Sequence, residues 1–176
     1  MLKRILLLCS LVWLSSCTGI PAGLTAVKPF ELTKYAGTWH EVARLDHSFE
    51  RGLTEVTAEY QLQADGTVRV LNRGYDAAKG EWRDAEGVAR FVDRTDEGRL
   101  KVSFFGPFYG AYNIIRLTPN YDMSLVVGPD LSYGWILARS KTPDAAQCAD
   151  FYLAAAEIGI PKDAWIRLLP CGEVNP

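Results

Sequence analysis

The sequence predicts an all-β fold: an eight-stranded antiparallel up-and-down β-barrel with a C-terminal α-helix packed outside it. Three observations lead to this prediction. Between residues 37 and 139, short runs alternate between apolar and polar side chains, the pattern of strands with one buried face. Short turn signals separate these runs, and short connections make neighbouring strands antiparallel. After residue 139, apolar side chains recur at helical spacing instead.

The composition is typical of one globular domain. The 176 residues are 48% hydrophobic and 23% charged, with a net charge of −2. A nucleic-acid-binding protein usually carries a basic surface, so this balance argues against that class. The sequence has no Cys/His cluster with metal-ligand spacing and no glycine-rich loop that opens a helix. We therefore expect neither a metal nor a cofactor.

Residues 1–16 have the pattern of a secretory signal peptide. Lys3 and Arg4 precede the apolar run ILLLCSLVWL, which is too short to span a bilayer as a helix. The following LSSC resembles the lipobox of bacterial lipoproteins. That resemblance implies cleavage before Cys17, diacylglycerol on its thiol and a fatty acyl chain such as palmitate on the new amine. Thr18 stands where an aspartate would resemble an inner-membrane retention signal, which points to the outer membrane.

The alternative for this end is an ordinary signal peptide with an incidental cysteine. Residues 17–30 are predicted to form a lipidated, extended tether, because prolines, glycines and small residues dominate them. The domain itself is expected over residues 31–176. Cys148 and Cys171 remain in it, and two such cysteines in an exported protein usually form a disulfide. The alternative is two separate buried thiols.

Eight strands are expected, the first of them beginning at Gly37. The other seven are TEVTAEYQL (54–62), TVRVLNRGY (67–75), WRDAEGVARFV (82–92), RLKVSFF (99–105), AYNIIRL (111–117), MSLVVG (123–128) and YGWILAR (133–139). Closing these strands into a barrel removes the exposed edges that an open meander would leave.

Alternation alone does not decide whether this barrel is hollow. Small side chains share inward phases with large aromatic ones: Ala58, Ala85, Gly87 and Ala89 with Tyr60, Phe104, Tyr112 and Trp135. Such a set forms either a cup with aromatic walls or a solid core in which small and large residues interlock.

The C-terminal helix is expected to begin at Thr142 as the N-cap, with Pro143 at the first helical position. Its apolar stripe comprises Cys148, Phe151, Tyr152, Ala155 and Ile158, and Gly159 ends it. We expect this stripe to cover Ile136 and Ala138, which lie on the outer phase of the last strand.

Three sequence blocks resemble the lipocalin family over about residues 29–172. They are YAGTWHEVARLDHSFERG with Gly37 and Trp39, AEYQLQADGTVRVLNRG, and WILARS with Arg139. The likeness is greatest to the apolipoprotein D-like bacterial outer-membrane lipocalin lipoproteins. It implies that Trp39 closes the narrow end of the barrel while Arg139 lies across its ring, a structural role. One departure is TPNYD, which lacks the aspartate that the family often has after Thr118.

The resemblance also implies a cavity for small apolar molecules. Tyr60, Asn72, Tyr112 and Trp135 match pocket positions of the family, and Phe104 is an expected wall. The implied function is binding, storage or transport of fatty acids or lysophospholipids by a protein that is anchored to the outer membrane through Cys17 and faces the periplasm. Envelope maintenance or stress is the expected setting.

The aromatic loop FFGPFYG, residues 104–110, has three interpretations. It forms a gate at the mouth, contacts a membrane or partner, or packs locally. Besides lipid binding and the enzyme considered next, a third hypothesis for the protein's role is a filled barrel that forms a homodimer through this loop.

The second hypothesis is a hydrolase or isomerase that acts on a lipid in the same cavity, and the sequence offers little for it. Asp46, His47 and Ser48 are adjacent, but a catalytic triad requires convergence in space. Glu41 is the best candidate for unusual chemistry. Alternation places it inward, where a buried carboxylate needs a partner, for which we consider Arg116. A structural ion pair is favoured over a catalytic acid.

Overall fold

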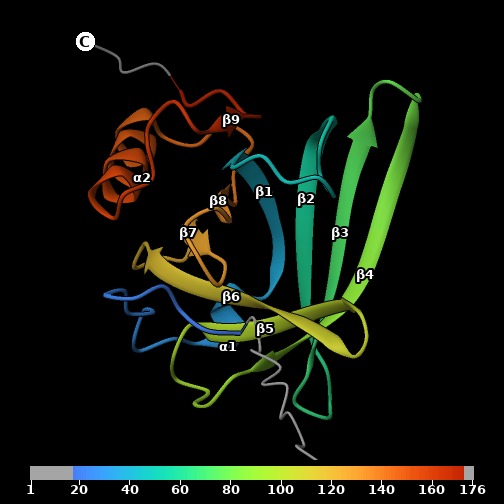
Figure 1. The fold of residues 1–176 in the computed structure, drawn as a ribbon, viewed down its shortest axis with the longest axis vertical. Coiled ribbons are helices and arrows are strands. Elements are labelled where there is room, and N and C mark those ends of the chain that lie inside the picture. Colours follow the sequence, from blue (N-terminus) through green and yellow to red (C-terminus); the bar gives the residue numbers. More distant parts are fainter. Residues whose placement is uncertain (1–17, 173–176) are drawn as a thin grey trace, which may run out of the picture.

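The structure, a computed structural model, describes residues 18–172 and forms a closed barrel with a helix on its outside (Figure 1). A four-residue helix, α1 (Leu32–Tyr35), precedes the barrel, and the helix α2 (Ala145–Glu157) and the short strand β9 (Ile166–Arg167) follow it. The barrel strands are β1 (Gly37–Arg44), β2 (Leu53–Leu62), β3 (Val68–Asp76), β4 (Glu81–Phe91), β5 (Arg99–Phe105), β6 (Phe108–Leu117), β7 (Met123–Val127) and β8 (Gly134–Ala138). Within residues 18–172, no helix is long and apolar enough to cross a membrane.

The barrel strands pair antiparallel in chain order, and β1 closes the ring by pairing with both β2 and β8. Trp39 of β1 lies opposite Ala58 of β2, and His40 lies opposite Ala138 of β8. The predicted eight-stranded up-and-down barrel is therefore confirmed. The strand β9 was not predicted, because two residues are too few for a pattern; it pairs with the last two residues of β1.

A β-bulge in β1 decides which of its side chains reach the interior. The register with β8 shifts between Glu41 and Ala43. Strict alternation would place Trp39, Glu41 and Ala43 on one face, but a bulge reverses the phase beyond it. Ala43 consequently packs in the outer core with α2, and Arg44 forms an ion pair with Glu41.

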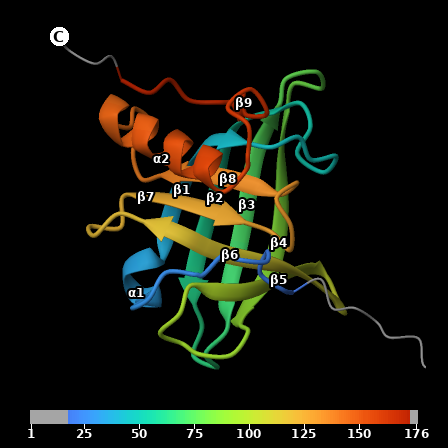
Figure 2. The same ribbon diagram turned by 60° about the vertical axis from the view of Figure 1, so that its left-hand side comes forward.

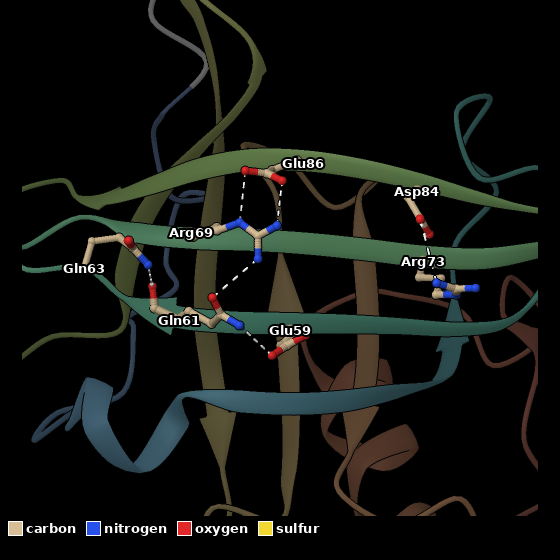
Figure 3. Close-up of polar contacts among 7 residues, drawn as sticks. All are labelled: Glu59, Gln61, Gln63, Arg69, Arg73, Asp84 and Glu86. Atoms are coloured by element: carbon tan, nitrogen blue, oxygen red, sulfur yellow. Dashed lines mark hydrogen bonds and ion pairs between the residues drawn. The ribbon is translucent and has the colours of Figure 1, made fainter.

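The outer face of β2, β3 and β4 is polar (Figure 3). Arg69 of β3 donates two hydrogen bonds to the Glu86 carboxylate on β4, at 2.9 and 2.6 Å, and a third to Gln61 of β2 at 3.4 Å. Arg73 and Asp84 form a second cross-strand ion pair at 3.8 Å. Since side chains alternate along each strand, this wet face leaves the apolar side chains of the same strands to line the interior.

Helix α2 covers the outside of the barrel over β1, β7 and β8 (Figures 1 and 2). Phe151 and Ala155 on its buried face belong to the same core as Ile136 and Ala138, as predicted. A disulfide joins Cys148 of α2 to Cys171, with 6.2 Å between their Cα atoms.

The start of α2 differs from the expectation by two residues. Asp144, not Thr142, is the N-cap, and its carboxylate accepts a hydrogen bond from the Gln147 amide at 2.9 Å. An aspartate at this position also places a negative charge at the positive end of the helix dipole. The helix ends as expected before Gly159, which has a φ of 101°.

The closed end of the barrel is built around Trp39 and Arg139. Trp39 is fully buried, and its Nε1 donates a hydrogen bond to the Tyr35 carbonyl at 2.8 Å. The Arg139 guanidinium lies 4.1 Å from the Trp39 ring centroid. Gly37 has a φ of 91°, and a Cβ atom there would lie 3.4 Å from Arg139 Nη1. The glycine of the Gly-x-Trp motif therefore provides the backbone conformation, next to the arginine.

In the turn between β6 and β7, Asp122 bonds Thr118, although the aspartate that lipocalins often have after this threonine is absent. The Thr118 hydroxyl donates to the Asp122 carboxylate at 2.5 Å and accepts from the backbone amides of Asp122 and Met123, both at 3.0 Å. Asn120 also donates to Asp122, at 2.6 Å. The departure in TPNYD thus leaves the turn fully bonded.

Residues 18–30 lie along the barrel wall. The Asn113 side chain donates to the Gly19 carbonyl at 3.0 Å. The Val27 amide donates to the Ile114 carbonyl, and the Val27 carbonyl accepts from the Gly98 amide. Phe30 is buried in the inner core. The segment includes a turn in which the Leu24 amide donates to the Pro21 carbonyl, and its contacts hold it against the barrel.

Candidate functional site

The barrel encloses a cavity of about 680 Å³ whose lining reaches the β1–β2, β5–β6 and β7–β8 connections. Apolar side chains form most of its wall. All five ligand-binding residues expected from the sequence line it: Tyr60, Asn72, Phe104, Tyr112 and Trp135. The interior is therefore a cup and not a solid core, which settles the alternative that alternation left open.

One of the small residues makes room for an aromatic wall and not for a ligand. A Cβ atom on Gly87 would lie 2.8 Å from a ring carbon of Phe104, so the phenyl ring lies directly against the β4 backbone. Ala58, Ala85 and Ala89 line the cavity itself. Phe104 thus keeps its ring near the wall because residue 87 lacks a side chain.

Three tyrosine hydroxyls join in a hydrogen-bonded chain inside the cavity. Tyr112 lies between the other two, 2.8 Å from the Tyr35 hydroxyl and 2.7 Å from that of Tyr60, and Tyr35 also lies 3.3 Å from Ser124 Oγ. Burial raises the pKa of Tyr35 to about 12 and the pKa values of Tyr60 and Tyr112 well above their usual range. These phenols therefore stay neutral and form a polar patch within an apolar cup.

A buried charged group occupies the wall nearer the mouth. Arg44 Nη1 donates to Glu41 Oε1 at 2.9 Å, and Arg44 Nη2 donates to the backbone carbonyls of Glu50 and Leu53 at 2.8 and 3.0 Å. Trp135 Nε1 donates to Glu50 Oε2 at 3.0 Å. Glu41, Glu50 and Trp135 all line the cavity. The expected partner of Glu41, Arg116, instead forms an ion pair with Asp150 of α2 on the outside.

Both carboxyls of this group have raised pKa values. Burial, and then the nearby Glu50 charge, raise the pKa of Glu41 to about 8 despite the Arg44 guanidinium. Burial also raises the pKa of Glu50, against the Trp135 hydrogen bond and Arg44. The two groups interact strongly, so they titrate as a pair, and the pair retains a proton into the neutral range.

Aromatic rings surround the mouth next to this group. His47 stacks between Phe49 and Tyr133, with centroids 5.3 and 5.2 Å away, and its ring lies 4.7 Å from that of Trp135. Among residues 18–172, its Nε2 has no hydrogen-bond partner. Asp46 pairs with Arg51 instead of His47. The adjacency of Asp46, His47 and Ser48 is therefore no triad, and these residues follow β1 in a loop, not on a strand.

The aromatic loop between β5 and β6 exposes two rings beside the mouth. Phe105 is 82% exposed and Phe108 is 78% exposed, while both border the cavity. The interpretation that this loop packs locally is therefore wrong for these two residues. Cys17 lies outside the described residues, so its lipidation stays an expectation.

Sequence reasoning missed several members of this site, for identifiable reasons. Arg44 escaped because the bulge in β1 turns it inward. Glu50 lies in a loop, where no periodicity applies. Ser124 was detectable, because it occupies the phase of β7 opposite to Met123, and that second phase faces the tyrosines.

Comparisons with known proteins agree with this geometry. Residues 30–167 match the model of the lipocalin-like domain. The outer membrane lipoprotein Blc of Vibrio cholerae is 50% identical over 162 residues, which cover 92% of this chain and 94% of that protein. The Blc of Escherichia coli K12 is 52% identical and covers 84% of both chains.

More distant relatives share the fold. Apolipoprotein D of Macaca fascicularis is 30% identical over 135 residues, which cover 73% of this chain and 68% of that one. Insecticyanin of the tobacco hornworm superposes with a TM-score of 0.69 at 22% identity and covers 88% of each chain. With an eight-stranded closed barrel, a base closed by tryptophan and arginine, and a family model that matches most of its length, the chain belongs to the lipocalin family.

Proposed function

We propose that this lipocalin binds fatty acids or lysophospholipids in the barrel cavity and stores or carries them at the outer membrane, in the maintenance of the cell envelope. The open cavity of about 680 Å³ with largely apolar walls carries the proposal. Its volume lies in the range of about 300–1,000 Å³ that small-molecule sites occupy. The acyl chain would contact Leu100, Val102 and Phe104, and its burial contributes roughly 25 cal/mol per Å² before the cost of immobilisation.

Tyr60, Asn72 and Tyr112 supply polar contacts within the apolar cup. Asn72 Oδ1 is buried and has no hydrogen-bond partner among residues 18–172. A buried polar atom without a partner is costly, so a ligand hydroxyl or a water molecule that donates to it stabilises the bound state.

The exposed rings of Phe105 and Phe108 support uptake of lipid directly from a bilayer. Both point to solvent instead of closing over the cavity, which favours membrane contact over a gate. They lie beside the opening, so a lipid that leaves the bilayer there reaches the cavity without crossing bulk water.

Anchoring through Cys17 would keep the barrel close to the membrane. Gly19 is held to β6 by Asn113, so the proposed acylated cysteine lies only two chain steps from a residue at the barrel wall. Two extended residues span about 7 Å. The relatives named outer membrane lipoproteins support this location.

Native mass spectrometry of the delipidated protein, titrated with a lysophospholipid, tests the proposal. We expect one bound lipid per barrel at micromolar ligand. The variant Ala58→Trp places a large ring on the cavity wall and should abolish this species, whereas Arg69→Gln on the outer face should leave it unchanged. Absence of bound lipid on the unmodified protein would contradict the proposal.

A carrier is distinguished from an enzyme by mass balance. The second candidate function is catalysis. The observation in its favour is that Glu41 retains a proton near neutral pH, as general acids do. Its contacts are those of a buried ion pair, and no nucleophile is activated by a histidine among residues 18–172. We expect incubated lysophospholipid to be recovered intact; a stoichiometric excess of cleaved or isomerised product would favour the enzyme.

A further inference from the structure

The buried group on the cavity wall has more negative than positive charges. Glu41 is 3% exposed, Arg44 2% and Glu50 8%, so water screens none of them well. Two carboxylates and one guanidinium leave one excess negative charge when both acids are ionised. Burying an unpaired charge is costly, so the empty cavity requires either a proton or a cation at this place.

Arg44 directs both of its terminal nitrogens to other partners, and its buried Nε has no hydrogen-bond partner among residues 18–172. Its Nη1 bonds Glu41, and its Nη2 bonds two backbone carbonyls that fix the β1–β2 loop. The carboxyls, by contrast, each keep an oxygen for a ligand. Glu41 Oε2 and Glu50 Oε1 form no hydrogen bond with any residue between 18 and 172, and both side chains line the cavity. The wall therefore offers hydrogen-bond acceptors to a ligand, whereas Arg44 is not among the residues that line the cavity.

Aromatic residues also line the cavity beside this group, and Trp135 contacts Glu50 directly. Phe49, Tyr133 and Trp135 line the same side of the cavity near the mouth. The face of an aromatic ring attracts a cation, most strongly where water is excluded. Carboxylate oxygens beside aromatic faces are the environment that an alkylammonium group prefers.

We infer that Glu41 and Glu50 form a subsite for the ammonium headgroup of a single-chain lipid whose acyl chain lies deeper in the cup. This inference rests on the proposed lipid-binding function and names the headgroup chemistry that the cavity selects. A carboxylate or phosphate headgroup without an ammonium meets two acids at this place and is disfavoured.

Binding exchanges one cation for another. In the empty cavity the carboxyl pair retains a proton, since the pKa of Glu41 is raised to about 8 by burial and by Glu50. The charged or titratable groups that face this carboxyl are Arg44 on β1, Glu50 in the β1–β2 loop and Tyr60 on β2. When the ammonium arrives, this proton leaves to solvent and the carboxyl becomes the anionic partner of the headgroup.

Lysophospholipids with one acyl chain and three headgroups test the inference on the purified, delipidated protein. The ethanolamine and choline forms carry an ammonium, and the glycerol form does not. By calorimetric titration we expect the ethanolamine form to bind about tenfold or more tightly than the glycerol form, the effect of one buried charge-assisted contact. Equal affinities, or a preference for glycerol, would overturn the inference while leaving lipid binding intact.

Variants locate the preference. Glu50→Gln should reduce it to about threefold or less through loss of ethanolamine affinity, and Glu41→Gln should do the same. Asp84→Asn is the matched control, because residue 84 also borders the cavity, but its half-exposed carboxylate pairs with Arg73 on the outer face of β3 and β4. A preference that survives both glutamate changes would place the headgroup elsewhere and overturn the inference.

The unmodified protein provides a readout that depends on no variant. Titration at neutral pH in two buffers of different ionisation enthalpy measures the protons released on binding. We expect release with the ethanolamine and choline forms and none with the glycerol form. No release with any of the bound lipids would overturn the inference, and failure of every lysophospholipid to bind would overturn the proposed function with it.

Discussion

The two ends of the barrel are each organised by an arginine, with opposite results. At the closed end, Arg139 donates to five backbone carbonyls, those of Lys34, Tyr35, Ala36, Thr38 and Tyr121, at 2.8 to 3.3 Å. Near the mouth, Arg44 bonds two backbone carbonyls and Glu41, with Glu50 close by. Carbonyls carry no net charge, whereas two carboxyls compete for one guanidinium.

This difference separates a structural arginine from one that sustains a binding surface. Arg139 has its N–H groups bonded and its face covered by Trp39, so the closed end offers nothing to a ligand. The group around Arg44 keeps an excess of acceptors that only a proton or a bound cation satisfies. We expect changes at the closed end to alter stability and changes near the mouth to alter pH dependence and binding.

The largest expected effect is that of Trp39→Ala. Trp39 is fully buried at the base, and removal of its indole leaves a cavity and an uncovered Arg139. We expect a loss of about 3–5 kcal/mol in the free energy of unfolding, measured by urea denaturation. Trp82→Ala, at a half-exposed tryptophan on β4, should cost clearly less. Equal losses in the two variants would mean that Trp39 does not close the barrel.

Arg139→Lys tests whether the closed end depends on charge or on the shape of the guanidinium. A lysine keeps the charge but cannot reach several carbonyls while lying flat on an indole. We expect thermal unfolding to show a loss of about 1–3 kcal/mol. Arg94→Lys, in an exposed ion pair with Asp96, should cost less than about 1 kcal/mol. If the lysine at 139 were tolerated equally well, charge alone would account for the contact.

The sequence was informative about the closed end and much less so about the mouth, for a physical reason. Trp39 lies in β1 and Arg139 directly follows β8, each within a local motif, so pattern and family resemblance located both. Glu41 was also recognised as inward, but its assigned partner, Arg116, lies on the outer face. A β-bulge shifts the alternation before Arg44, and the loop after β1 places Glu50 beside it. Neither feature produces a periodic pattern in the sequence.

The carboxyl pair should give the protein a stability that falls as pH rises towards mildly alkaline values. The folded-state pKa of Glu41 is raised from 4.5 to about 8, so the folded protein binds more protons than the unfolded chain between these values. Stability is therefore highest below the lower value and is lost as pH rises through the upper one, by at most about 1.4 kcal/mol per pH unit for one proton.

Urea denaturation between about pH 5 and pH 8 measures this slope. Glu41→Gln, which carries no titratable proton, should flatten it. Glu86→Gln is the control: Arg69 lowers the pKa of that exposed carboxyl, so its contribution changes only at lower pH. An unchanged slope in Glu41→Gln would show that Glu41 does not take up a proton over this pH range.

The smallest effect on stability is expected from the paired change Phe105→Ser and Phe108→Ser. Both rings are exposed, so the free energy of unfolding should stay within about 0.5 kcal/mol of the original. Transfer of a fluorescent fatty acid from vesicles should nevertheless slow several-fold, while affinity for the same lipid as a free monomer stays within about twofold. A gate would behave differently, because its removal would speed exchange with monomeric lipid. Comparison of the two transfer routes therefore distinguishes a membrane contact from a gate at the mouth, and unchanged rates by both would leave the exposed rings without a part in lipid uptake.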